Sequence, residues 1–401
     1  MDEGSVRFGC CERLMKVLVG ATDVTSSAQS FEYTPDLNGL WSGEVRLPSS
    51  LAPGITEGGT ELVITTNGGS TLFAGPCWYG EDDGDANDQM TTINGFDHRC
   101  KWPFRQVQDD DGDYSDPTIF QDFENAVDIM AAAIDNDIAN DGTYGISLGS
   151  TSASSFPLIG FKPTDWPWTM QHLWEFLVNT GTLDVMLVPG AGGSTVDLYP
   201  GDAGTDLSGS VTFDYNTGSF NCMNAKYTFD MKNTISRIRY FLGPKRPFYR
   251  GDIQHYSGDV QIDDPDLDTY DPAKQAVIEA QSASMEGTTG LLREIQIYDA
   301  NPPLPVGANP PEIVGENALR DLYFAQWQSE MLVRTVPRRL LSVTPEPGVT
   351  PTFGVGDIIT VNANIRGSVG GAQRVYRYTH AQDVDGNEMI TSLITTADGE
   401  T

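Results

Sequence analysis

Three aspartate-rich segments are the parts of this chain whose residue types could bind a metal ion. They are Glu81–Asp85, Asp109–Asp113 and Asp383–Glu388. Alternating carboxylates in a loop can converge on calcium, which takes six to eight oxygen ligands. The second segment, counted from its first residue, lacks the sixth-position glycine and twelfth-position glutamate of an EF-hand. Because Asp-Gly is itself a turn signal, we interpret the segments as solvated turns. The aspartates at which cation binding stays open are Asp83, Asp111 and Asp385.

The four histidines show no spacing typical of a metal or catalytic site. His98, His172, His255 and His380 lie far apart, so none has the i, i+4 spacing of a helical zinc site. Gly190–Gly193 is glycine-rich but lacks the spacing of a dinucleotide-binding loop, and we interpret it as a linker. We therefore assign no catalytic residue, no cofactor-binding residue and no metal ligand, and we predict that the protein is not an enzyme.

Two sugar-related alternatives stay open. A glycosidase needs two carboxylates, but with 56 acidic residues such pairs arise by chance. Trp166, Trp168 and Trp174 could form a sugar platform or an interface. Packing at the start of a helix is the favoured interpretation, because tryptophan is highly buried on average. His172 lies on the same predicted helix and is interpreted as a packed or surface residue.

The charge of the chain is its strongest bulk signal. It has 56 acidic and 24 basic residues and a formal net charge of -32, spread along all 401 residues. Aspartate is in excess and lysine is scarce, which favours adaptation to concentrated salt over an ordinary acidic surface. Salt relieves the self-repulsion, because the Debye length falls from about 8 Å at 0.15 M to roughly 3 Å at 1 M. A basic face that binds nucleic acid is not expected.

Cysteine use and hydropathy favour a protein made in the cytoplasm. Cys77 and Cys100 could pair, but an odd count of five cysteines favours buried free thiols. The first residues lack the apolar core of a signal peptide, so none is expected. No run of 18 apolar residues occurs, so no membrane-spanning segment is expected either.

Periodicity predicts a β-rich start to the chain. Trp41, Val45 and Leu47 alternate with polar residues, as in a half-buried strand. Six strands are expected before residue 100, with an acidic loop between the last two. They are Leu14–Val19, Ser30–Thr34, Leu40–Leu47, Glu61–Thr65, Thr71–Tyr79 and Met90–Phe96.

The rest of the chain alternates between helical and strand patterns. Apolar residues at helical spacing predict helices over Ile119–Ile138, Thr169–Asn179, Pro272–Met285 and Glu316–Arg334. Residues 189–208 are expected to form a glycine-rich linker or loop. Further strands are expected at Leu183–Val188, Ser210–Tyr215, Ala225–Asp230, Ile235–Leu242, Leu291–Tyr298, Arg338–Thr344, Ile358–Ile365, Arg374–Thr379 and Met389–Thr395.

The order of these elements resembles that of the minor tail proteins, or baseplate hubs, of long-tailed phages. The matching steps are Trp41, Leu47-Pro48, Phe73-Ala74-Gly75 and Gly95-Phe96-Asp97. These motifs are short, so the resemblance depends on their order. It implies a trimer in which two tube-like β-domains per chain build a ring that continues the tail tube and surrounds the path of the DNA.

The resemblance implies a mainly β fold with α+β insertions: two tube-like β-barrel or sandwich domains plus helical inserts. The expected parts are an N-terminal tube-like domain over 1–108, an α/β insert over 109–188, a second tube-like domain over 189–262 and 336–401, and a peripheral insertion over 263–335. Implied partners are further copies of the chain, distal tail, tape-measure and central spike or fibre proteins, with viral DNA passing unbound. The implied location is the virion tail tip. Combined with the charge, the resemblance predicts a tailed virus of a halophilic host. Alternatives are a distal tail or receptor-binding protein of the same tail tip, or a halophilic secreted-type hydrolase of the glycosidase class.

Overall fold

The structure is a computed structural model that describes the larger part of the chain. The described ranges are 15–85, 88–108, 126–152, 168–179, 183–201, 203–216, 219–230, 234–242, 294–299, 338–363 and 369–397, with a few single positions. Several expectations lie wholly or mostly outside these residues: the start of the Ile119–Ile138 helix, the Pro272–Met285 and Glu316–Arg334 helices, Asp109–Asp113, Trp166 and His255. Within the described ranges, no helix is long and apolar enough to cross a membrane.

The first part of the chain forms the expected antiparallel strands. They are β1 (Met15–Val19), β2 (Thr22–Asp23), β3 (Ser30–Thr34), β4 (Ser42–Pro48), β5 (Glu61–Thr66), β6 (Thr71–Asp85) and β7 (Asp88–Phe96), with a short 3-10 helix, η1 (Ser49–Leu51), after β4. One expectation was wrong. The acidic segment Glu81–Asp85 is not a loop but the outer half of β6, paired with β7 as far as Asp88. Backbone pairing therefore overrides the turn signal of Asp83-Gly84.

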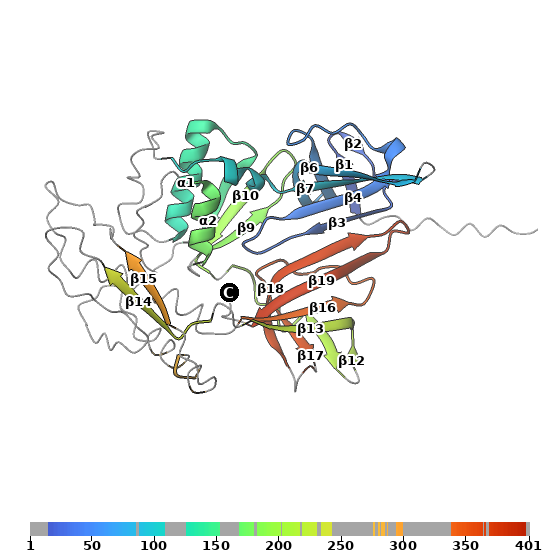
Figure 1. The fold of residues 1–401 in the computed structure, drawn as a ribbon. Helices are drawn as coiled ribbons and strands as arrows, with labels where there is room; N and C mark the ends of the chain where they lie inside the picture. Colours follow the sequence, from blue (N-terminus) through green and yellow to red (C-terminus); the bar gives the residue numbers. More distant parts are fainter. Residues whose placement is uncertain are drawn as a thin grey trace, which may run out of the picture.

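The middle of the chain is an α/β unit. Its elements are η2 (His98–Phe104), α1 (Ala126–Asp141), β8 (Ile146–Thr151), α2 (Met170–Asn179), β9 (Asp184–Val188) and β10 (Ser194–Tyr199). Strands β8, β10 and β9 form a sheet of their own, and Figure 1 shows both helices beside it. The predictions of α2 and β9 are confirmed. The linker expected over residues 189–208 was wrong in part, because β10 lies inside it and pairs with both β8 and β9.

The C-terminal part returns to strands, and the mainly β prediction is confirmed. The strands are β11 (Thr212–Asn216), β12 (Ser219–Phe220), β13 (Cys222–Asp230), β14 (Arg237–Leu242), β15 (Glu294–Asp299), β16 (Arg338–Pro345), β17 (Ile358–Ala363), β18 (Val369–Gln382) and β19 (Glu388–Ala397). β14 and β15 form a separate parallel pair. All the others join the N-terminal strands in one sheet of 14 strands. Among the described strands, β2, β12 and β13 are edges of this sheet, each paired with one neighbour. The described strands therefore form no closed barrel.

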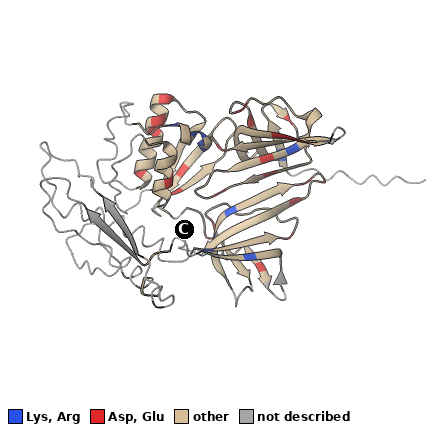
Figure 2. Ribbon diagram, in the orientation of Figure 1, with Lys and Arg blue, Asp and Glu red and all other residues tan. Residues whose placement is uncertain are grey.

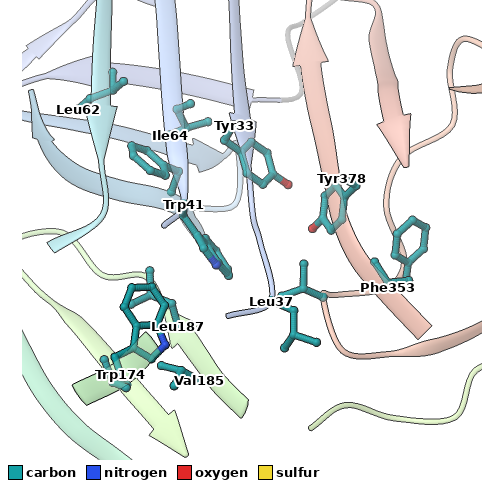
Figure 3. Packing of buried hydrophobic residues seen from close by; sticks show 14 of the residues in the cluster. Tyr33, Leu37, Trp41, Leu62, Ile64, Trp174, Val185, Leu187, Phe353 and Tyr378 are labelled. Atoms are coloured by element: carbon teal, nitrogen blue, oxygen red, sulfur yellow. The ribbon is translucent and has the colours of Figure 1, made fainter. Parts of the chain in front are cut away.

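The core is continuous through all three parts. One cluster of buried apolar residues includes members from the N-terminal strands, the α/β unit and the C-terminal strands. Figure 3 shows Trp41 and Leu37 of the N-terminal part close to Trp174 of α2 and Tyr378 of β18. The alternation that predicted the half-buried strand β4 is present, since Val45 and Leu47 are fully buried.

Two glycines lie where the N-terminal strands pack closely: Gly75 of the Phe73-Ala74-Gly75 motif, and Gly43 of β4. A Cβ atom on Gly75 of β6 would lie 1.9 Å from the carbonyl oxygen of Phe96. A Cβ atom on Gly43 of β4 would lie 2.5 Å from the ring of Phe73. The Phe73-Ala74-Gly75 and Gly95-Phe96-Asp97 motifs therefore contact each other, and their glycines are needed for close packing.

Replacing Gly75 with alanine should destabilise the fold strongly. The new methyl group would overlap backbone atoms, which cannot rotate away, so we expect a loss of at least about 2 kcal/mol in the free energy of unfolding. Urea unfolding measures this loss. Gly80→Ala in the same strand is the control, because the nearest atom to its Cβ would be 3.7 Å away. Equal stability of the two variants would contradict the packing described for Gly75.

Candidate functional site

A buried carboxylate, Asp184 of β9, joins the three parts of the molecule. Its Oδ2 atom accepts hydrogen bonds from the guanidinium group of Arg374 in β18 and from the N–H of Ala203 (3.1 Å). Its Oδ1 atom accepts from the side-chain amide of Asn38, in the loop before β4 (2.9 Å). Asn38 in turn accepts from the N–H of Val185 (2.7 Å). Both charged groups are buried, so each depends on the other for neutralisation.

Arg374 uses its other donors on backbone carbonyls. The receiving oxygens belong to Gly201 (3.2 Å), Ala203 (2.7 Å) and Gly356 (3.2 Å). A planar guanidinium group with five fixed donors suits such a set, because it can satisfy a carboxylate and several carbonyls at once. The side chain therefore holds β18 and the segments around residues 201 and 356 in one fixed arrangement.

The two β parts meet directly at a seam between β3 and β18. Strand β18 pairs antiparallel with β3, with His380 opposite Tyr33. At one end of the seam, Arg377 Nε donates to Asp36 Oδ2 (2.8 Å) and the N–H of Leu37 donates to the carbonyl of Tyr376 (2.8 Å). Figure 1 shows this seam as the place where the N-terminal and C-terminal strands run side by side. A continuous sheet makes the seam stiffer than a linker would be.

His380 is buried at this seam without a full set of strong partners. Its Nδ1 lies 3.3 Å from the hydroxyl of Tyr33, and its Nε2 lies 3.5 Å from the carboxylate of Glu388. Burial lowers the pKa of His380 to about 4. Burial also raises the pKa of Glu388 above its usual range. The seam therefore favours the uncharged form of both side chains.

A serine, a histidine and a glutamate meet between the first β part and the α/β unit. Ser194 Oγ lies 3.1 Å from His98 Nδ1, and His98 Nε2 lies 3.0 Å from Glu61 Oε1. The hydrogen bond from His98 lowers the pKa of Glu61, which also accepts from the N–H of Gly192 (2.9 Å). These residue types could form a hydrolase triad. However, Ser194 is only 2% exposed, so a substrate has no access to it and we interpret the group as a structural link.

A second nucleophile pattern escaped the sequence analysis. Residues 145–149 read Gly-Ile-Ser-Leu-Gly, which matches the G-x-S-x-G pattern of the esterase elbow. The elbow requires a sharp turn from a strand into a helix, whereas Ser147 lies within strand β8. Its hydroxyl is 3.2 Å from the hydroxyl of Thr195 on β10. The match therefore has none of the geometry that the chemistry needs.

The two aspartate-rich segments that the structure describes, Glu81–Asp85 and Asp383–Glu388, use carboxylates within the chain. Asp83 pairs with Arg46 at 3.3 Å. Asp383 accepts hydrogen bonds from the N–H groups of Asp385 (2.9 Å) and Asn387 (2.8 Å), as in a tight turn between β18 and β19. Among the described residues, no three metal-binding side chains converge. Cation binding near Asp83, Asp111 and Asp385 therefore stays the alternative that the sequence left open.

The structure also describes a tryptophan, a histidine and two cysteines for which the sequence left alternatives open. Trp174 is buried and lies against Trp102, with ring centroids 5.2 Å apart, so its interpretation as a packed residue is confirmed. His172 is exposed on α2.

Cys77 and Cys100 are buried free thiols, and burial raises their pKa values to about 11 and about 12. They do not form the disulfide that the sequence left open.

No known protein-family model matches the chain, and no curated protein matches it either. Solved structures with the same fold exist. A tail protein from Neisseria meningitidis MC58 aligns with 96% of this chain and 96% of its own at a TM-score of 0.56 and 12% identity. The 43 kDa tail protein of prophage MuSo2 from Shewanella oneidensis aligns with 96% of this chain and 98% of its own at a TM-score of 0.56 and 11% identity. Prophage tail protein gp18 from Listeria monocytogenes EGD-e aligns with 96% of this chain and 95% of its own at a TM-score of 0.50 and 12% identity. The chain therefore has a fold that is found in phage tail proteins.

Replacing Arg374 with methionine should be strongly destabilising. The substitution leaves Asp184 buried without its counter-charge, and breaking such a pair costs about 3–5 kcal/mol. Arg46→Met is the matched control, because its ion pair with Asp83 is exposed and should contribute less than about 1 kcal/mol. Chemical unfolding of both variants tests the difference. Similar losses in the two variants would show that the Asp184 pair does not have this role.

The buried His380 should make the free energy of unfolding decrease at acid pH. Its pKa is about 6.5 in an unfolded chain and about 4 in the fold, so the unfolded state takes up the proton first. The stability contribution is complete above pH 6.5 and falls by up to about 3 kcal/mol as the pH decreases towards 4. The difference in unfolding free energy between wild type and His380→Asn should change over this window. His172→Asn, an exposed change on α2, should show no such dependence.

Proposed function

We propose that this protein is a structural component of a virus tail tip, where copies of the chain form a hub ring that continues the tail tube. Sheet continuity between the two β parts is the observation that carries the proposal. A ring subunit must hold its two β-domains at a fixed angle, and the β3–β18 seam with the Asp184–Arg374 pair does so. The similarity in fold to phage tail proteins over 96% of the chain supports the same role.

The ring would be a trimer in which each chain contributes two tube-like domains. Homo-oligomers with closed symmetry need complementary edges, and open sheet edges offer backbone groups for pairing. In this chain the described sheet has such an edge at β13, which pairs only with β16. The expected neighbours are a distal tail protein, the tape measure and a central spike or fibre protein. The proposed division into two tube-like domains and two inserts belongs to this same hypothesis.

The charge of the chain fits passage of DNA through such a ring. A net charge of -32 would repel phosphates from the lumen, so DNA could slide without binding. The same charge favours a virus of a salt-loving host, since only a concentrated electrolyte screens this repulsion well. No catalytic step is included in the proposal.

A distal tail ring or receptor-binding protein of the same tail tip is the second candidate. The fold similarity supports any tail component, because the matched proteins are described as tail proteins without a stated position. A hexamer would favour the distal ring, whereas a trimer favours the hub. A halophilic hydrolase is the third candidate, and it would require an accessible pair of carboxylates.

The mass of the assembled protein tests the hub proposal. At about 2 M KCl we expect a trimer of about 131 kDa, three times the chain mass of 43.6 kDa, and partial dissociation at about 0.1 M because repulsion is less screened. Light scattering combined with electron microscopy of the particles distinguishes a three-fold ring from a hexamer. A monomer at both salt concentrations that hydrolyses a polysaccharide would contradict the proposal.

A further inference from the structure

The outer half of β6 has an edge that no described strand covers. From Thr71 to Pro76, β6 pairs with β5, and from Cys77 to Asp85 it pairs with β7 on its other side. Cys77 is the last residue whose backbone groups on the side away from β7 are hydrogen-bonded. Its N–H donates to Thr60 and its carbonyl accepts from Gly58. Beyond it, the backbone groups that point away from β7 have no partner among the described residues. Figure 1 shows this hairpin projecting past the neighbouring strands.

Exposed aromatic side chains lie where this open edge begins. Trp78 is 39% exposed and Tyr79 is 54% exposed. Phe104, at the end of η2, is 72% exposed and stacks on Trp78 with ring centroids 6.1 Å apart. The register of β6 against β7 shifts between Cys77 and Tyr79, so Trp78 sits in a β-bulge. Bulges re-aim side chains, and exposed aromatic clusters are typical of protein interfaces.

Acidic side chains continue the same edge. Tyr79, Glu81 and Asp83 share one face of the strand, because side chains alternate along β6. All three are exposed, and the Tyr79 hydroxyl donates to Glu81 (3.2 Å). Figure 2 shows acidic residues among the N-terminal strands. Asp83 is paired with Arg46 at 3.3 Å. The surface therefore presents an aromatic residue followed by two carboxylates at alternate positions.

Two cations that follow β7 in the chain, Lys101 and Arg105, are engaged within the molecule. Lys101 Nζ donates to the carbonyl of Tyr144 (2.9 Å), and Arg105 pairs with the buried Asp137 at 2.7 Å. They do not neutralise the edge. A second copy of this acidic chain would bring like charges against it, which is unfavourable for paired strands.

We infer that the Trp78–Gly84 edge is a docking site for an extended, arginine- or lysine-rich segment of a different protein, which adds to the sheet as a strand beside β6. Backbone hydrogen bonds to the open edge would supply affinity. A basic side chain of the segment would face Glu81, since Asp83 already pairs with Arg46, and an arginine could also stack on Tyr79 or Trp78. This docking site does not depend on the hub proposal, because it lies within a single chain.

A synthetic peptide of alternating arginine and valine, fluorescently labelled, tests the site on the full chain. We expect binding that an alternating glutamate and valine peptide does not show. N-methylation of alternate residues keeps the charge of the peptide but removes strand hydrogen bonds, so it should abolish binding. Equal binding of the N-methylated peptide would overturn the inference and leave only general charge attraction.

Matched variants locate the binding on the chain. Glu81→Lys should weaken binding by about tenfold, because it replaces an opposite-charge pair with a like-charge pair. Glu346→Lys, an exposed change beyond β16, alters the net charge equally and should have less than about a twofold effect. Trp78→Ala should weaken binding, whereas Met223→Ala on β13, also exposed, should not.

The oligomeric mass, measured on the same variants, separates this site from the ring. If Glu81→Lys or Trp78→Ala changes the number of chains in the particle and the peptide does not bind, a second copy occupies the edge and the inference is wrong. If the chain is monomeric and still binds the arginine-valine peptide through Glu81, the docking site stands and the hub proposal fails.

Discussion

The arrangement of this molecule depends on one desolvated pair of charges, Asp184 and Arg374. Each group is buried, and an isolated charge in such surroundings would be too costly to keep. The carboxylate comes from the α/β unit, the guanidinium group from the C-terminal strands, and the amide of Asn38 from the N-terminal part. Moving any one part away would leave a charge or a polar group without its partner. The pair therefore fixes three parts of the chain at one point.

The seam between β3 and β18 and the link formed by Ser194, His98 and Glu61 extend this constraint. The seam lies between the two β parts, and the link lies between the first β part and the α/β unit. Polar contacts of this kind add little net stability but impose a defined geometry, because few arrangements satisfy every group. The ring proposed above would need such a defined geometry, because every copy in a closed symmetric assembly makes the same contacts.

The sequence predicted local elements well and contacts between distant elements poorly. Alternating burial identified β4, and helical spacing identified α2, because both signals lie within a few residues. β10 was missed because the glycines around it dominate the local signal, and the outer half of β6 was missed because its acids indicate a turn. Nothing near Asp184 points to Arg374, which follows 190 residues later. The motif glycines were found as a pattern, but their packing role required the structure.

The buried ion pairs also bear on the choice of basic residue, since the chain has 17 arginines and 7 lysines. Buried carboxylates at structural positions are paired with arginine: Asp97 with Arg99, Asp137 with Arg105, and Asp184 with Arg374. A planar guanidinium group satisfies a carboxylate and nearby carbonyls together, which an ammonium group does less well. Arg99, Arg105 and Arg374 are therefore used within the described part of the molecule, while carboxylates such as Glu81 remain exposed. A surface charged in this way resists non-specific self-association, and contacts with it are favoured for partners that bring their own cations.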